Sequence, residues 1–337
     1  IEINQPEFYA KVTSVDLNTQ SRSGISKAAI QIKKPGSLIQ LAIPHIAVDF
    51  QLHSSDFTSI DLPSLYIQSP DIEIKQTKTA HVTSPAVVAV KEKQTEISIG
   101  NLLIQKGTVN YSNERSSDSF SIRTGIDIAG ENVLHGNSGT AMLSWKSLGV
   151  QLSALQVKKK DTEISLADMD AELKSGKIHV QDQLLNLNTL LALTWNGAQV
   201  NLTKADSTGM RINKLSGHIQ NHAFSFYQKE KFDWKKYISL LSLNGVYLYY
   251  KTQTSSIAAN EIVYNGPAKS VTVNTFKFTP DADAETWFKQ KGWQAGYTFL
   301  ETGKININGF SLKDDSIFKA SKLMIEGAKL TTMKDKR

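Results

Sequence analysis

The chain has 337 residues, 40% hydrophobic and 21% charged, proportions that indicate a folded protein and exclude disorder over most of its length. A net charge of +6 is a mild excess for this length and does not predict a nucleic-acid-binding face. The absence of cysteine excludes disulfides, thiolate metal centres and a cysteine nucleophile. No apolar run reaches about 18 residues, so the sequence predicts no membrane-spanning helix.

Alternation of apolar and polar residues is the main signal along the chain, and it predicts β-strands with one apolar and one polar face. It is clear at 97–111, at 271–278 and at 305–312. Before the first of these, residues 77–93 combine threonine, serine, proline and lysine and predict a long loop. Glycine and asparagine at 130–139 mark a weaker break, which is not enough to divide the chain. We therefore expect one region over 1–337.

Helical signals are few. Residues 235–243 and residues 281–289, which follow a proline, predict two short helices. A doubly wound α/β fold needs long amphipathic helices between its strands, and these are missing. The sequence therefore predicts an all-β protein with a mainly antiparallel sheet.

A loose repeat recurs along the chain, with two alternating apolar residues, a turn residue, and two more alternating apolar residues. Each copy predicts a strand, a tight turn or bulge, and a second strand. The copies start roughly 35 residues apart or near multiples of that, which favours an elongated stack, while a meandering β-sandwich stays open as an alternative. The copies are Leu65–Ile74, Leu102–Tyr111, Ala171–Val180, Gly217–Phe226 and Leu323–Thr332.

The sequence offers no catalytic constellation and predicts no cofactor or metal. His218 and His222 lie in a strand-like segment, where residues four apart are separated by about 13 Å and cannot share one ion. Asp281, Asp283 and Glu285 lack the glycine and glutamate of a calcium loop, and are typical of a helix N-terminus. Phosphate-binding glycine loops are absent too.

The run from Ile97 to Tyr111 resembles the strand repeats of AsmA-like proteins, a superfamily that includes the TamB-like envelope proteins of Gram-negative bacteria. The segment 62–74 is similar, and so is the C-terminal stretch with its short helix at 284–291 and strands at 303–312 and 320–330. The resemblance covers most of the chain in pattern, but it contains no specific motif and no catalytic residue.

This resemblance implies a curved sheet folded along its length into a trough of repeated hairpins with an apolar interior. It also implies a periplasmic protein held in the inner membrane by an N-terminal helix, with a role in moving phospholipid toward the outer membrane. Because the chain starts at Ile1 without a methionine, we expect a fragment that lacks this anchor. The expected partners are phospholipid or another acyl lipid, the membrane, and envelope proteins.

The same function is expected from the residues, because an uncovered apolar sheet face is a binding surface and each buried methylene of an acyl chain gains about 0.8 kcal/mol. We therefore predict a non-enzymatic lipid-binding groove. Two alternatives remain, a factor that pairs its sheet edge with outer-membrane clients, and a carbohydrate-binding or adhesive β-sandwich. The predicted groove residues are Ile97, Ile99, Leu102, Ile104, Val109, Tyr111, Ile305, Ile307, Phe310 and Leu312.

Overall fold

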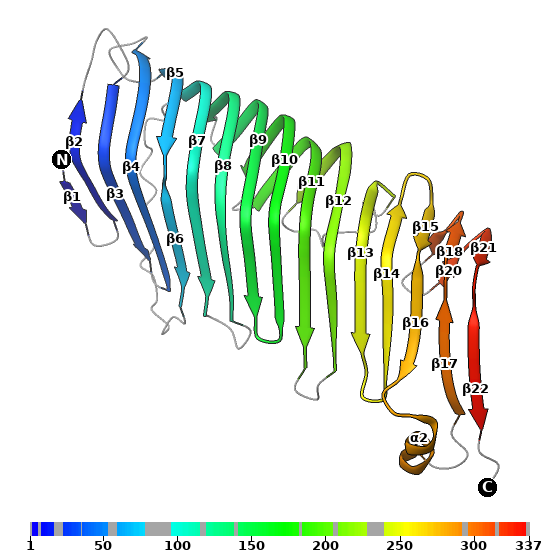
Figure 1. The fold of residues 1–337 in the computed structure, drawn as a ribbon. Coiled ribbons are helices and arrows are strands. Elements are labelled where there is room, and N and C mark those ends of the chain that lie inside the picture. Colours follow the sequence, from blue (N-terminus) through cyan, green and yellow to red (C-terminus); the bar gives the residue numbers. More distant parts are fainter. Residues whose placement is uncertain are drawn as a thin grey trace. The chain divides into compact units, whose positions relative to one another are not determined.

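The chain is all-β, as predicted. Its computed structural model places the strands in a 20-stranded sheet and a two-stranded sheet, and the described residues also form a short helix, α2 (Figure 1). The structure describes residues 2–5, 8–16, 23–34, 36–52, 59–77, 96–114, 119–137, 141–181, 184–204, 208–227, 239–291, 296–313 and 317–334. The predicted loop at 77–93 lies outside these residues, except for Thr77.

The chain divides into two compact units. Unit 1 comprises Ile1–Lys160, Asp168–Leu193 and Asn221–Phe232, and unit 2 comprises Asp161–Ala167, Thr194–Gln220 and Asp233–Arg337. Three strands contribute residues to both units: β10 (Thr162–Gln181), β11 (Leu184–Thr203) and β12 (Gly209–Tyr227).

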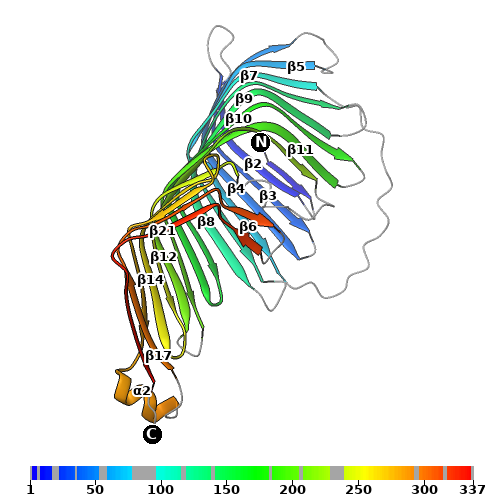
Figure 2. The same cartoon turned by 90° about the vertical axis from the view of Figure 1, so that its right-hand side faces the viewer.

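Unit 1 follows the chain from strand to neighbouring strand. β5 and β6 both pair antiparallel with β4 on one side and parallel with β7 on the other, and the other neighbouring strands from β1 to β9 pair antiparallel. Figure 2 shows the long strands β7 and β9 bending along their length, which gives this unit a curved sheet. The strands are β1 (Glu2–Gln5), β2 (Phe8–Asp16), β3 (Ser23–Lys34), β4 (Ser37–Leu52), β5 (Ser59–Gln68), β6 (Asp71–Gln76), β7 (Glu96–Asn113), β8 (Phe120–Asn137) and β9 (Ala141–Lys159).

In unit 2, the sheet continues from β12 to β13 and β14. Different parts of β14 then pair with two short strands, and each of these begins its own series of antiparallel strands. One series is β15–β18–β21 and the other is β16–β17–β22, while β19 and β20 form the two-stranded sheet. The strands are β13 (Leu241–Lys251), β14 (Ser255–Asn265), β15 (Ser270–Val273), β16 (Thr275–Pro280), β17 (Gly296–Thr302), β18 (Ile305–Asn308), β19 (Ser311–Lys313), β20 (Ile317–Lys319), β21 (Lys322–Ile325) and β22 (Lys329–Lys334).

Helix α2 (Ala284–Lys291) confirms the helix predicted at 281–289, although it begins three residues later. Asp283 caps it, because the Thr286 backbone N–H donates to Oδ1 (2.8 Å) and the Thr286 hydroxyl to Oδ2 (3.1 Å). These hydrogen bonds hold the pKa of the Asp283 carboxyl below its usual value. The interpretation of this acidic cluster as a helix N-terminus is thereby confirmed.

The helix predicted at 235–243 is wrong at its C-terminal end, where Leu241–Leu243 begin strand β13. Residues 228–238 lie outside the described part of the chain. Leu241 and Leu243 alternate with Ser242, as in a strand, and pairing with β12 and β14 overrides a weak helical preference.

The repeat copies are bent strands rather than hairpins. Leu102–Tyr111 lies within β7 and Ala171–Val180 within β10, while Leu65–Ile74 continues from β5 into β6 along the same neighbours. In four of the five copies the residue before the predicted turn position has a positive φ: Ser69, Lys106, Ser175 and Gly327. The bulge named as one possibility is present in the β7 copy, where the register against β8 shifts at Lys106.

Candidate functional site

Apolar residues form continuous cross-strand rows in unit 1. Partners that lie directly opposite in neighbouring strands point to the same face of a sheet. Row 1 runs through Ile32, Ile39, Ile74, Tyr111, Ile122 and Val157, one residue from each of six adjacent strands. Row 2 runs through Val15, Ile25, Ile46, Ile67, Ile104, Ile128 and Val150, one from each of seven.

Both rows lie on one face of the sheet, which we call the apolar face. In β8, Ile122 of row 1 and Ile128 of row 2 are six residues apart, an even spacing that points both side chains to the same side. In β7 the corresponding residues, Tyr111 and Ile104, are seven apart, which on a regular strand would separate them. The register of β7 shifts at Lys106, whose φ is 54°, and this bulge returns Tyr111 to the face of Ile104.

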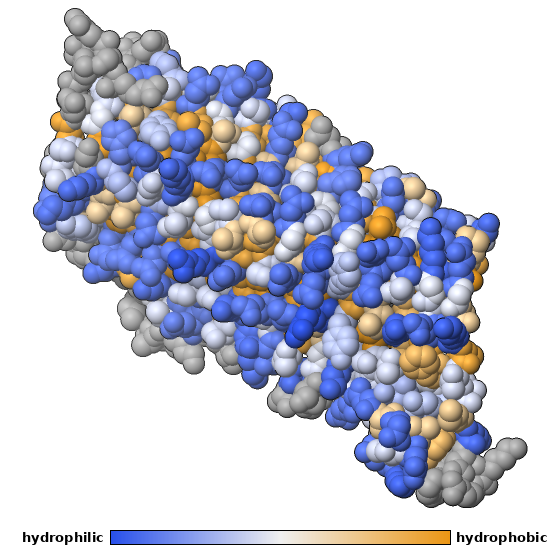
Figure 3. Space-filling view, viewed as in Figure 1, coloured by the Kyte–Doolittle hydropathy of each residue, from blue (hydrophilic) through white to orange (hydrophobic). Residues whose placement is uncertain are grey.

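Beside row 1, the opposite face is polar. Next to row 1, one position along each strand, a second row contains only polar side chains: Gln31, Gln40, Glu73, Asn110, Arg123 and Gln156. Figure 3 shows a surface on which hydrophilic residues predominate and hydrophobic ones lie between them. Each of these strands is therefore two-faced, as the alternation predicts.

The apolar face is only partly shielded from solvent. The side chains of row 1, and those of row 2 except Val15, are half-buried rather than buried, and Val15 is 42% exposed. Among the described residues no large side chain falls below 2% exposure. A second packed sheet would bury the residues of one face completely. Within the described part of the chain, the rows therefore have no covering layer.

Side chains complete the hydrogen bonding where strands bend. The Lys106 N–H donates to Asp127 Oδ1 (2.5 Å), and the buried Thr124 hydroxyl donates to the Ser153 carbonyl (3.2 Å), next to a register shift in the pairing of β8 with β9. A bulge frees backbone groups from the ladder, and a buried free group is costly. These side chains therefore stabilise the bends.

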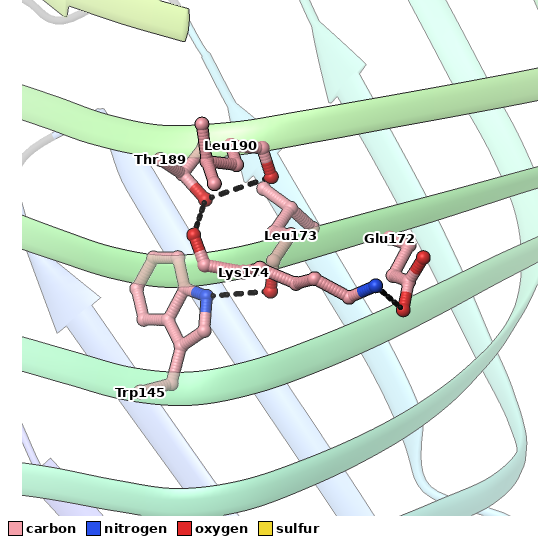
Figure 4. A network of polar contacts seen from close by, with 6 residues as sticks. All are labelled: Trp145, Glu172, Leu173, Lys174, Thr189 and Leu190. Atoms are coloured by element: carbon pink, nitrogen blue, oxygen red, sulfur yellow. Dashed lines mark hydrogen bonds and ion pairs between the residues drawn. The ribbon is translucent and has the colours of Figure 1, made fainter. Parts of the chain in front are cut away.

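A second bend lies in β10, where Ser175 has a φ of 52°. Figure 4 shows polar contacts of the residues next to it. The indole N–H of Trp145, 5% exposed, donates to the Leu173 carbonyl (3.1 Å), and the buried Thr189 hydroxyl donates to the Lys174 carbonyl (3.1 Å). Gly176 lies under the Trp145 ring so closely that a Cβ there would overlap it. Unit 2 repeats this arrangement with Trp195 over Gly217.

Sequence reasoning missed the residues that build these bends. Thr124, Trp145 and Thr189 are buried polar or amphipathic side chains, and their acceptors belong to neighbouring strands. The sequence signal that could have indicated these bends is a break in the alternation of apolar and polar residues followed by a glycine, as at Gly107 and Gly176.

The six predicted groove residues of β7 are all half-buried. Ile104 belongs to row 2 and Tyr111 to row 1. Val109 lies in register with Ile72, and Leu102 with Leu65. Ile97 and Ile99 pair with two further apolar residues of β5, Ile60 and Leu62.

The remaining predicted residues lie in unit 2. Ile307 pairs with Val271 and Leu323, and Ile305 with Val273 and Ile325, so that both belong to short apolar rows. Phe310 and Leu312 do not continue β18. Phe310 is buried against the Tyr264 ring, with 5.2 Å between centroids, and burial raises the pKa of the Tyr264 hydroxyl. Leu312 lies in β19, opposite Phe318 in the two-stranded sheet.

Charged side chains of unit 2 pair across strands on exposed surface. Lys277 Nζ lies 2.8 Å from Glu301 Oε1, and this hydrogen bond lowers the pKa of the Glu301 carboxyl. Within the described residues no group of three or more histidine, aspartate or glutamate side chains is placed to hold a metal ion. Over the same residues, no helix has the length and apolar character needed to cross a bilayer.

Neither a family model nor a curated protein matches the sequence.

Proposed function

We propose that the apolar face of unit 1 binds the acyl chains of a lipid, in a non-enzymatic carrier or conduit of the bacterial envelope. The observation that carries this proposal is the pair of uninterrupted apolar rows on a face without a covering layer in the described part of the chain. An apolar surface of this extent marks a site of interaction. The polar row next to row 1 lies on the opposite face, and its side chains can be solvated by water, so this part of the opposite face is not expected to bind acyl chains.

The dimensions of the rows suit an acyl chain lying across the strands. Row 2 makes six steps between strands, which at about 4.8 Å each gives about 29 Å. A bilayer core of about 30 Å contains two layers of tails, so one tail spans about 15 Å and fits within the row. A tail of about 15 methylenes with half its surface buried would gain about 6 kcal/mol.

The resemblance to AsmA-like proteins supports the same proposal, and with it a periplasmic location at the inner membrane. The bent strands and one-sided apolar rows are what such a lipid-conducting sheet requires. No specific polar group is needed, since headgroups would remain in water while tails occupy the apolar face.

The absence of cysteine allows a sharp test, because a single introduced cysteine can be labelled alone. Ile104→Cys places an environment-sensitive fluorophore in row 2, and Leu103→Cys places it on the adjacent residue of the opposite face, where the side chain is 37% exposed. Incubation with phosphatidylethanolamine and phosphatidylglycerol vesicles should shift the emission of the Ile104 label toward the blue and leave the Leu103 label unchanged.

Native mass spectrometry of the purified chain provides a second readout. We expect co-purifying phospholipid that is lost in Ile104→Asp and Ile128→Asp but retained in Leu103→Asp, with circular dichroism as a check that each variant is folded. A chain that is free of lipid, remains so after incubation with vesicles, and gives equal fluorescence changes at both labels would refute the proposal.

A further inference from the structure

The polar row of unit 1 borders a hollow in the surface of the sheet. The row continues onto β2, where Tyr9 lies opposite Gln31. The hollow extends over β2, β3, β4 and β6, and three members of the polar row, Gln31, Gln40 and Glu73, line it together with Tyr9. Its volume is about 400 Å³, which is within the range of about 300–1,000 Å³ that is typical of small-molecule sites.

The hollow exists because two alanines interrupt the long side chains of this face. Ala29 and Ala42 lie directly opposite each other, and each is two residues from a glutamine of the polar row, so their methyl groups point to the same side as that row. Ile30 and Leu41 also line the hollow, and since their side chains alternate with those of the alanines, they contribute backbone to its floor. Asp71 lies opposite Ala42 and forms the wall on the side of β6.

The two glutamines offer hydrogen-bond donors and acceptors side by side. Gln31 and Gln40 lie directly opposite each other, and both are half-buried. Each amide group can donate two hydrogen bonds and can accept through its oxygen. Within the described residues neither amide group has a hydrogen-bond partner, so both are available to a ligand.

The two carboxylates of the hollow already have partners that compensate part of their charge. The Thr108 hydroxyl donates to Asp71 Oδ1, and Lys75 Nζ lies 2.7 Å from Glu73 Oε1. A positively charged ligand would have to compete with Lys75 for Glu73, which disfavours a cation. A carboxylate can accept about four hydrogen bonds, so both groups retain the capacity to accept from hydroxyls.

From these groups we infer that the hollow binds a neutral sugar ring of a glycan. The flat face of a pyranose ring carries C–H groups, which pack against an aromatic ring such as that of Tyr9. Its rim carries hydroxyls, which donate to carboxylates and exchange hydrogen bonds in both directions with amides. The hollow lies on the face opposite row 1, so the inference goes beyond lipid binding and does not depend on it.

Titration calorimetry and amide NMR shifts test the inference on the purified chain. The probes are the neutral trisaccharides cellotriose, maltotriose and chitotriose, with choline as a cationic comparison. At least one trisaccharide should bind more tightly than choline, with an affinity that changes little as salt is added, because neither ring nor hydroxyls carry a charge. The largest amide shifts should fall on residues 29–31, 40–42 and 71–73. Binding should persist in Ile104→Asp, the variant expected to lose phospholipid.

Filling the hollow should abolish binding. Ala42→Gln places a long side chain over its floor, and the fold should persist because Ala42 is exposed. Asp71→Ala removes an acceptor at another exposed position and should weaken binding about tenfold. The matched control Ala167→Gln makes the same substitution at an exposed alanine of β10 and should bind as the unaltered chain does. The inference is overturned if no trisaccharide binds, if choline binds more tightly, if the shifts fall elsewhere, or if Ala42→Gln binds like the control.

Discussion

Replacing Gly176 by alanine should disrupt the second bend of unit 1. A Cβ at this position overlaps the Trp145 indole, whose ring is almost fully buried and whose N–H is bonded to the Leu173 carbonyl. Forcing a side chain into a packed site costs about 1–3 kcal/mol, and loss of the indole hydrogen bond adds about 1 kcal/mol. The reduced freedom of the unfolded chain offsets about 0.4–1 kcal/mol. The net expected loss in the free energy of unfolding therefore lies between about 1 and about 3.6 kcal/mol.

Gly149→Ala is the matched control, because Gly149 lies in β9 of the same unit and its added Cβ would meet only the Ala129 carbonyl, at 3.7 Å. This variant should be neutral or slightly stabilising. Urea unfolding followed by circular dichroism measures both. The overlap should also vanish in a Trp145→Ala background, so that Gly176→Ala costs little there. Equal stability of the two glycine variants, or a penalty that persists without Trp145, would refute the reasoning.

Two further outcomes follow from the bends and the helix cap. Deleting Lys106 removes the bulge residue and keeps Tyr111 on the same face as Ile104, whereas deleting Asn110 turns Tyr111 to the polar face. Urea unfolding should therefore show the Asn110 deletion to be less stable than the Lys106 deletion by at least about 2 kcal/mol. Equal stability of the two deletion variants would contradict this. The pKa of Asp283 is lowered in the folded chain, so its cap is fully present above the ordinary carboxyl value of about 3.9 and is lost as pH falls through the lower folded value. The amide resonance of Thr286 should therefore titrate with a midpoint below 3.9, and a midpoint at or above that value would argue against the cap.

The strands and their faces could be predicted from the sequence because alternation is a local signal. Ile104 and Tyr111 were both predicted to lie on the apolar side of their strands, and each of them belongs to an apolar row. The sequence could not decide between a turn and a bulge in the repeat. The positive φ falls on Lys106 and Ser175, whereas sequence patterns associate a positive φ with glycine or asparagine. Pairing of both halves with neighbouring strands, together with the hydrogen bond from the Lys106 N–H to Asp127, holds the lysine in this conformation.

The bend donors and the edge could not be predicted for a different reason. Thr124 and Thr189 bind carbonyls that come within reach only when the neighbouring strands are in register. The sequence pattern around Leu330 is the same as around a half-buried apolar residue of an inner strand. Leu330 is exposed because, in the described part of the chain, no strand pairs with β22 on its outer side. Properties that depend on the neighbour of a strand are invisible to a pattern within that strand.

The bends and the apolar face have a common origin. A break in alternation would turn half of a long strand's apolar residues to water, and a bulge at the break returns them to one face while bending the strand. Crowding is then greatest inside the bend, where Ala28 and Ile43 face each other at 8% and 7% exposure, next to Lys27 with its φ of 54°. Between the bends the rows stay half open. Residues packed inside the bends therefore hold the fold, while half-buried residues away from them, such as Ile74, keep exposed apolar surface for the proposed ligand.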